Sequence, residues 1–325
     1  MSFFTGKKIV VTGGTGFAGS HLVEKLLKEG AEVTVPYRNK EKAKKNLHYV
    51  FNKVILVEGS LENKEFCSTL LQKKDMVFHC AADVGGIQYN ILHSGTIFRE
   101  NLSVFMNVID AARINNVERF LVVSSACVYP PKCTIPTPES EGFKDAPEQT
   151  NEGYSWAKRM EEFIAQAYIK EFGMNIAIIR PSNMYGPRDN FSQEKAHVIP
   201  NLLRKIINNE DPIVVFGTGN PTRAFLYVED FCSGVLVAIE KGINAGPINI
   251  GSDQEISIKK LIALLCNHSQ KNPKIIFDVT KPDGHARRAS DIQKAKQMLG
   301  WQPTVSLDEG IKKTVEWYLQ EFKHD

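Results

Sequence analysis

Short apolar runs alternate with amphipathic stretches through the first half of the chain. Between the apolar runs, apolar side chains recur every three or four residues, most extensively over 98–115 and 152–172, and this spacing predicts helices. Nearly continuous apolar strands that alternate with helices are typical of a parallel sheet covered on both faces. The pattern therefore predicts a doubly wound α/β fold. Its strands are expected at residues 8–12, 32–35, 54–57, 76–80, 120–123 and 176–179.

The regular alternation ends after Arg180-Pro181. One helix is expected from about residue 197, another helix with a strand over 229–250, and one more strand at 275–277. Residues 130–150 contain five prolines and are the most loop-like stretch. We expect two units, a larger one from 1–180 with about 229–250, and a smaller interleaved one from 181–228 with 251–325.

The composition excludes several classes of protein. The chain has 325 residues, 42% of them hydrophobic and 24% charged, which is ordinary for a globular protein. The 40 basic residues nearly balance the 37 acidic ones, which excludes a broad nucleic-acid face. No apolar run approaches the ~18 residues of a membrane span, and the start leads directly into a strand, so we expect no signal peptide and no membrane partner. Six cysteines without a C-x-x-C pair indicate reduced thiols and a cytoplasmic protein.

Three glycines, Gly13, Gly16 and Gly19, lie between the first expected strand and the first expected helix. Glycine permits a tight turn and lets the backbone approach a pyrophosphate, while the helix N-terminus supplies partial positive charge. A glycine triplet alone is a weak signal, but this strand–loop–helix setting favours a dinucleotide site. The larger unit is therefore expected to be a Rossmann domain, and the smaller one to bind substrate.

The choice of cofactor depends on the end of the second strand. NAD enzymes usually place a carboxylate there to bind the ribose 2′-hydroxyl, but this chain has no acid until Glu41. Arg38 is suited to a 2′-phosphate through forked hydrogen bonds. We therefore favour NADP(H), with NAD(H) as the alternative if Arg38 merely belongs to the solvated, lysine-rich stretch 40–53.

Tyr154 and Lys158 form a Y-x-x-x-K pair on one face of an expected helix. Tyr49 and Lys53 share that spacing, but only Tyr154 follows the fifth strand, whose end carries Ser124-Ser125. Active sites of open parallel sheets lie at such strand ends. We expect the nearby ammonium and an oxidised nicotinamide both to lower the pKa of the Tyr154 phenol, which would let it exchange a proton with a sugar oxygen during hydride transfer.

Together these residues resemble the extended short-chain dehydrogenase/reductase family, whose members are nucleotide-sugar epimerases, dehydratases and reductases. The resemblance covers essentially the whole chain. It is carried by residues 12–19, 79–82, Asn101, Ser124-Ser125, Tyr154 with Lys158, 180–187, 287–291 and 299–303.

The resemblance implies an enzyme with a hydride-transfer triad of Ser125, Tyr154 and Lys158. It implies a sugar-nucleotide in the smaller region, with Arg223 and Arg288 on its diphosphate, although either arginine could instead form a surface salt bridge. Relatives pair the helices at 98–115 and 152–172 into a dimer bundle, so a homodimer is expected unless these stripes only pack on the sheet. The implied cofactor contacts are Gly13, Thr15, Gly16, Phe17, Gly19, Arg38, Leu61, Ala81, Ala82, Asn101, Ser124, Tyr154, Lys158 and Pro181.

Residues 81–87 and 124–130 resemble two families in particular, GDP-L-fucose synthase and GDP-mannose 3,5-epimerase. Residues 189–191 with 197–200 resemble the fucose synthase pattern, whereas 194–196 resemble the epimerase pattern, in which the lysine works as acid/base. Both enzymes invert C3 and C5 of a 4-keto sugar. The implied substrate contacts are Val84, Gly85, Gly86, Asn183, Val198, Leu202, Arg223 and Arg288.

The chemistry accounts for these residue types. A 4-ketone acidifies the hydrogens on C3 and C5, so inversion needs a base on one ring face and an acid on the other. Cys127 would be the base, and His197 or Lys195 would return the proton. Alternatively, Cys127 is a small buried hydrophobe and His197 a helix cap. Dehydratase relatives carry an Asp–Glu pair where this chain has Ala126 and Cys127, so elimination of water lacks its acid.

We therefore expect an NADP(H)-dependent GDP-4-keto-sugar 3,5-epimerase/4-reductase without a metal ion. The alternatives are an NAD-dependent GDP-mannose 3,5-epimerase, another nucleotide-sugar 4-epimerase or 4-reductase, and a non-catalytic dinucleotide sensor, which would have no use for Tyr154 and Lys158. The chain departs from the fucose synthase pattern in the length of 39–53, in Ser60, where relatives often have an aspartate, and in carrying Lys195 together with His197. The nucleotide base of the substrate, the exact sugar and whether the reaction is a net reduction stay open.

Overall fold

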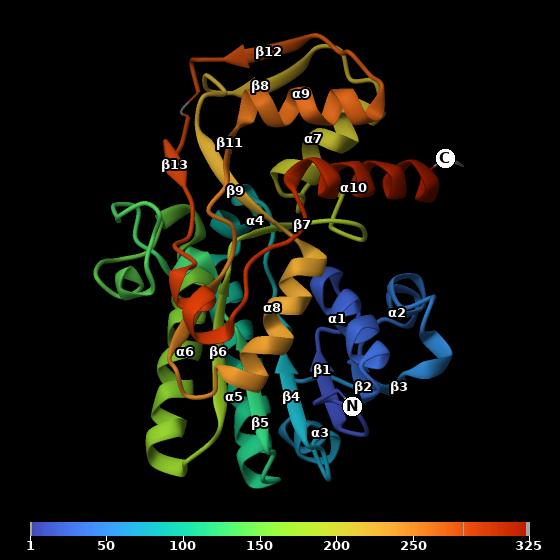
Figure 1. The fold of residues 1–325 in the computed structure, drawn as a ribbon, viewed down its shortest axis with the longest axis vertical. Coiled ribbons are helices and arrows are strands. Elements are labelled where there is room, and N and C mark those ends of the chain that lie inside the picture. The colour runs from blue at the N-terminus through green and yellow to red at the C-terminus, as the bar shows by residue number, and fades with distance from the viewer. Residues whose placement is uncertain (1, 282, 323–325) are drawn as a thin grey trace.

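The computed structural model describes residues 2–281 and 283–322. Its centre is a seven-stranded parallel sheet in the order β10-β6-β5-β4-β1-β2-β3 (Figure 1). This order places β1 in the interior and confirms the predicted doubly wound α/β fold. The strands are β1 (Lys8–Thr12), β2 (Glu32–Tyr37), β3 (Ile55–Glu58), β4 (Met76–His79), β5 (Arg119–Val123), β6 (Ile176–Pro181) and β10 (Pro247–Ile250).

Alternate residues of each strand enter hydrophobic cores on opposite faces of the sheet. On β1, Ile9 and Val11 belong to one core and Val10 to the other, and all three are fully buried. Full burial of such a side chain contributes about 1.5–3 kcal/mol, which is why both faces need helices. One face packs against α1 (Phe17–Lys28) and α8 (Val228–Lys241), and the other against α3 (Lys64–Leu70), α5 (Ser94–Ile114) and α6 (Glu152–Phe172).

The two longest helices, α5 and α6, lie side by side, as Figure 1 shows. They match the helices predicted over 98–115 and 152–172 closely. α6 ends because Gly173 adopts a left-handed conformation with φ of 66°, a common way to terminate a helix. The connection between β5 and α6 contains only three short 3-10 turns, η2 (Ala126–Val128), η3 (Glu139–Glu141) and η4 (Gln149–Asn151), as its prolines predicted.

The smaller region lies beyond the carboxyl ends of the sheet strands (Figure 1). The predicted strand at 275–277 is present as β12, but the other strands of this region were not predicted from the sequence pattern, because several of them are too short to show a periodicity. Helices α7 (Val198–Ile207), α9 (Ile258–Ser269) and α10 (Leu307–Glu321) form a third core with these strands. The strands are β7 (Asn183–Tyr185), β9 (Thr222–Tyr227), β11 (Glu255–Ser257) and β13 (Arg287–Arg288) in one sheet, and β8 (Ile213–Phe216) with β12 (Ile275–Asp278) in another.

Four further short helical segments complete the described chain, namely α2 (Lys40–Asn46), the 3-10 turn η1 (Phe51–Lys53), α4 (Ile87–Leu92) and a π-helical turn at Ala295–Leu299. Leu299 and Trp301 are buried in the core of the larger unit, so the chain returns there after β13. None of the helices in the described residues has the length and apolar character required to cross a membrane.

Candidate active site

The glycine loop between β1 and α1 is packed tightly against the chain that follows β4. Gly13 has φ of 68°, and a Cβ added to it would lie 2.8 Å from the Ala81 nitrogen, so only glycine fits. Gly16 is the N-cap of α1 and provides no side-chain hydrogen bond to the first turn. The N–H groups of that turn therefore have no capping side chain as hydrogen-bond acceptor, an arrangement that suits a pyrophosphate.

At the end of β2, the Arg38 guanidinium is 75% exposed, and its Nη1 lies 3.7 Å from Glu62 Oε1. This ion pair is loose enough for Arg38 to turn to a phosphate. Glu62 also lines a shallow surface depression with Ser60 and residues 63–65. Sequence reasoning missed Glu62, because it lies beyond β3 and approaches Arg38 only in the fold.

The predicted triad comes together at the carboxyl ends of β5 and β6. Tyr154 and Lys158 project from α6, where Lys158 is 2% exposed, and the Lys158 Nζ lies 5.7 Å from the centre of the Tyr154 ring. Ser125 precedes the η2 turn, and its Oγ accepts a hydrogen bond from the Cys127 backbone nitrogen at 3.1 Å. The structure therefore places the three residues around one point.

The expected lowering of the Tyr154 phenol pKa is wrong for the protein itself. Burial raises the pKa of Tyr154, Cys127 and Glu161 raise it further, and a hydrogen bond with Ser125 lowers it only in part. The Lys158 ammonium does not act as expected, because its Nζ donates a hydrogen bond to Glu161 Oε2 at 2.9 Å. Tyr154 is therefore held as a neutral proton donor.

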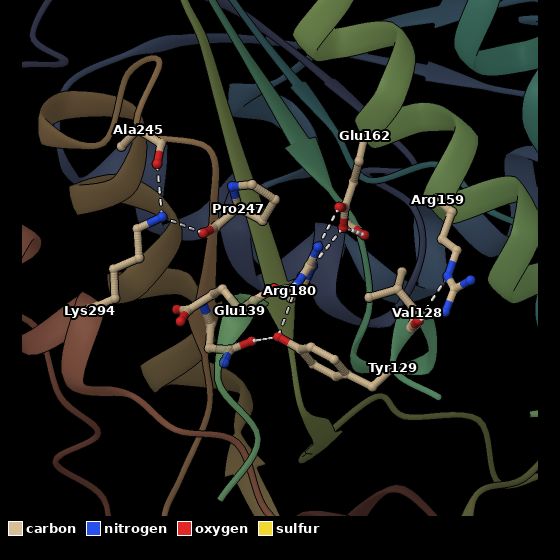
Figure 2. Close-up of polar contacts among 11 residues, drawn as sticks. Val128, Tyr129, Glu139, Arg159, Glu162, Arg180, Ala245, Pro247 and Lys294 are labelled. Carbon is tan, nitrogen blue, oxygen red and sulfur yellow. Dashed lines mark hydrogen bonds and ion pairs between the residues drawn. The ribbon is translucent and has the colours of Figure 1, made fainter. Parts of the chain in front are cut away.

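A buried polar cluster fixes the turn that carries Ser125 and Cys127. It consists of Glu162, Arg180 and Tyr129, which Figure 2 labels, together with Asn249, and we call it the buried clamp. Arg180 donates two hydrogen bonds to the Glu162 carboxylate, at 2.7 and 2.8 Å, and one to the Tyr129 hydroxyl at 3.2 Å. The Tyr129 hydroxyl in turn donates to Asn249 at 2.5 Å. Because the clamp joins α6, β6, β10 and the end of η2, it holds the catalytic turn rigid.

Several of the implied cofactor contacts also make hydrogen bonds within the protein. The Ser124 hydroxyl donates to Glu162 at 2.5 Å, which joins it to the buried clamp. The Asn101 side chain accepts from the Asp83 nitrogen at 2.7 Å and donates to the Asp83 carbonyl at 2.9 Å. The Leu61 carbonyl accepts a hydrogen bond from Asn107 at 3.0 Å. Asn101 therefore shapes the chain after β4, beside Ala81 and Ala82.

Cys127 lies half-buried on the η2 turn, two residues after Ser125, and is close enough to Tyr154 to affect its pKa. His197 is the N-cap residue of α7, but its side chain makes no capping hydrogen bond within the described chain. The helix-cap alternative for His197 is therefore not supported. The surrounding chain lowers the pKa of His197 by desolvation, although part of the residue faces solvent.

Lys195 lies on a polar cluster that the sequence did not reveal. Its Nζ lies 3.4 Å from Asp83 Oδ1 and 3.7 Å from the centre of the Tyr89 ring. The Tyr89 hydroxyl donates to the other Asp83 oxygen at 2.7 Å. Although burial opposes it, the hydrogen bonds and charges of Tyr89 and Asp83 raise the pKa of Lys195, so its ammonium is held protonated.

The two segments that resemble substrate loops touch each other. A Cβ added to Gly86 would lie 3.2 Å from the Glu194 carbonyl. Residues 83–86 therefore border residues 194–197. Among the other implied substrate contacts, Leu202 is buried, Val198 is 42% exposed, and Asn183 donates to the Ala224 carbonyl at 3.2 Å.

Arg223 and Arg288 are register partners in the parallel pair of β9 and β13. Arg223 donates to the Thr222 and His285 carbonyls, each at 2.7 Å. Among the acidic residues that the structure describes, Arg288 approaches only Glu148, with 4.0 Å between Nη2 and Oε2. Burial and the neighbouring Arg288 lower the pKa of Arg223, so a bound anion would relieve this repulsion.

The glycine loop and the buried Tyr154–Lys158 pair, at one edge of a parallel sheet, define an enzyme of the dinucleotide-binding Rossmann class. The sequence model of the NAD dependent epimerase/dehydratase family matches residues 9–251. The chain belongs to this family.

Similarity to individual proteins extends over the whole chain. It is 35% identical to GDP-L-fucose synthase of Sinorhizobium fredii, over 98% of each protein. It is 29% identical to GDP-mannose 3,5-epimerase 1 of rice, over 98% of this chain and 83% of that protein. Among solved structures, the UDP-glucose 4-epimerase of Thermotoga maritima in complex with UDP-glucose superposes with a TM-score of 0.86 at 29% identity, over 96% and 99% of the two chains.

Proposed function

We propose that the protein is an NADP(H)-dependent GDP-4-keto-sugar 3,5-epimerase/4-reductase. The observation that carries this proposal is the η2 turn, which presents Ser125 and Cys127 together beside Tyr154. Of these three residues, a site that only transfers a hydride needs Ser125 and Tyr154 but not Cys127. A thiol on the same turn adds a group able to remove a proton next to the carbon that is reduced.

The reducing step uses Ser125, Tyr154 and Lys158. The bound nicotinamide dinucleotide supplies the hydride. Ser125 donates a hydrogen bond to the C4 oxygen of the sugar, and Tyr154 transfers its hydroxyl proton to that oxygen. Because burial keeps Tyr154 protonated, the resting site is prepared to donate a proton, as a reductase requires. Lys158 orients the cofactor ribose.

Inversion at C3 and C5 requires one protein group on each face of the sugar ring. Cys127, as thiolate, removes the proton that the 4-ketone acidifies, and the ketone oxygen stabilises the enolate through its hydrogen bond with Ser125. A proton is then returned from the other ring face by His197 or Lys195. Asp83 and Tyr89 raise the pKa of Lys195, whereas desolvation lowers the pKa of His197, so Lys195 is the group that carries a proton before each turnover.

The substrate class follows from the smaller region and from the relatives. Arg223 and Arg288 are adjacent cations that suit a diphosphate. The similar fucose synthase and mannose epimerase carry GDP-sugar names, which supports a GDP-sugar here. Arg38 supports NADP(H) over NAD(H) because its guanidinium is largely solvent-exposed.

We further propose a homodimer formed through α5 and α6. Met106 on α5 and Phe163 on α6 are 39% and 62% exposed, although both helices otherwise bury apolar faces.

The cysteines at positions 67, 80, 127, 133, 232 and 266 are all free in the described chain, which fits a reducing compartment such as the cytoplasm.

The second candidate is a 3,5-epimerase without net reduction, favoured by the Asp83–Tyr89–Lys195 cluster, since the epimerase pattern places a working lysine there. To separate the two, the protein is incubated in D₂O with GDP-4-keto-6-deoxymannose and either NADPH or NADH. We expect deuterium at C3 and C5 and stoichiometric oxidation of NADPH, faster than of NADH. In a parallel incubation with GDP-mannose and no NADPH, inversion of GDP-mannose would instead establish the second candidate. If neither incubation gave a reaction, the dinucleotide sensor would be the alternative that remains.

A further inference from the structure

The catalytic lysine has a buried acidic partner. Glu161 lies one helical turn after Lys158 on α6, and the two side chains are 0% and 2% exposed. Their charged atoms are 2.9 Å apart. The second carboxylate oxygen of Glu161, Oε1, has no hydrogen-bond partner within residues 2–281 and 283–322. A fully buried carboxylate with an unsatisfied oxygen is costly, so its presence beside the reacting groups needs an explanation.

We propose that Glu161 is a positioning residue that holds the Lys158 ammonium and keeps Tyr154 protonated, so that the site favours reduction over oxidation. This inference rests on the proposed role of Tyr154 as proton donor. It deepens that role by naming the group that sets the direction in which the proton moves.

The geometry gives two reasons for the effect. The carboxylate engages the ammonium that would otherwise stabilise a tyrosinate, and its own negative charge lies close enough to raise the pKa of Tyr154. Both effects disfavour ionisation of the phenol. In the reaction, the O–H bond of Tyr154 breaks as an O–H bond forms on the C4 oxygen, a hydride supplied by the nicotinamide would form the new C–H bond at C4, and the tyrosinate recovers one proton from solvent.

Other charged groups around the pair do not replace Glu161. Tyr154 also faces Cys127 from η2, which raises its pKa. Lys158 faces His79 and Cys80 at the end of β4, and burial favours the uncharged form of both. Glu162 on α6 is already bound by Arg180. Burial raises the pKa of Glu161 itself to about 7, so its charge is present above neutral pH, where tyrosine ionisation is measured.

The test replaces the charge and measures the phenol directly. Tyrosinate absorbance is titrated in the parent protein and in Glu161→Gln, each as the difference from its own Tyr154→Phe counterpart, which isolates Tyr154 among the nine tyrosines. We expect the Tyr154 midpoint in Glu161→Gln to fall by at least about one pH unit, which means about tenfold more tyrosinate at a given pH below the midpoint. Glu171→Gln, which removes an exposed carboxylate at the far end of α6, is the matched control and should leave the Tyr154 midpoint of the difference titration unchanged.

Because Glu161→Gln leaves a buried ammonium unpaired and is therefore prone to unfold, Glu161→Asp is titrated as well. The shorter side chain keeps the charge but retracts it, so a smaller shift in the same direction is expected. The kinetic counterpart is the pH profile of kcat for reduction, whose basic limb should move to lower pH in both variants. An unchanged or raised Tyr154 midpoint in a folded variant would overturn the inference. The titration needs no substrate, so it stays decisive if the proposed reaction fails.

Discussion

The hydride-transfer side and the substrate side of the site are built in different ways. Beneath the η2 turn, Arg180 and Glu162 are 2% and 0% exposed and bound through several hydrogen bonds. On the substrate side, Arg288 is about one-third exposed and has only Glu148 at 4.0 Å. Lys195 is similarly exposed. The first side is held in one geometry before any ligand arrives, whereas the second has partly exposed cationic groups, of which Lys195 is paired with Asp83 and Arg288 has a looser contact with Glu148.

This difference separates the chemistry from the choice of substrate. Proton and hydride transfer require reacting atoms to be held within a fraction of an ångström, which buried and fully bonded side chains provide. Selection among nucleotide sugars requires groups whose charge is not already neutralised. The family supports many substrates on one fold because the second set can vary without disturbing the first.

The largest effect is expected from breaking the buried clamp. Arg180→Met leaves the Glu162 carboxylate buried without its partner, and such changes cost about 3–5 kcal/mol. The free energy of unfolding, measured by denaturant titration, should fall by that amount. Arg287→Met, which removes an exposed ion pair with Glu255, should leave the unfolding midpoint unchanged. If both variants were equally stable, the buried clamp would not account for the rigidity of the hydride-transfer side.

A smaller effect of another kind is expected on the substrate side. Arg288→Gln removes a cation whose only ion-pair partner within 4.0 Å among the described residues is Glu148, so stability should hardly change. Loss of one charged hydrogen bond to a diphosphate costs about 1.5–3 kcal/mol, so KM should rise at least about tenfold with kcat nearly unchanged. Steady-state kinetics decide this, and an unaltered KM would remove Arg288 from the diphosphate site.

The sequence predicts most of the structure of the hydride-transfer side, because local sequence patterns determine it. Apolar runs mark the sheet strands, Gly13 marks the turn that packs on Ala81, and the four-residue spacing of Tyr154 and Lys158 places them on one face of α6. It does not predict the ionisation of Tyr154, because that depends on burial and on Glu161. A carboxylate three residues after a lysine is ordinary in any exposed helix, and only the fold shows that this pair is buried.

On the substrate side, the sequence predicts residue types but not their contacts. Lys195 and His197 are recognisable from flanking residues, yet the partners Asp83, in the loop before α4, and Tyr89, on α4, lie more than one hundred residues earlier in the chain. The strands β9 and β13, which bring Arg223 and Arg288 together, are also distant in sequence, and β13 has only two residues. Such pairings have no local signature, so only the folded chain reveals them.

The most direct test of the account separates inversion from reduction in one assay. Cys127→Ser and Tyr154→Phe are each incubated in D₂O with GDP-4-keto-6-deoxymannose and NADPH, and both deuterium at C3 and C5 and NADPH oxidation are measured against the parent protein. Cys127→Ser should lose deuterium incorporation by about 10²-fold or more, whereas Tyr154→Phe should lose NADPH oxidation to a similar extent and keep the exchange. Undiminished deuterium incorporation in Cys127→Ser would contradict the claim that this thiol inverts the sugar beside the hydride-transfer site.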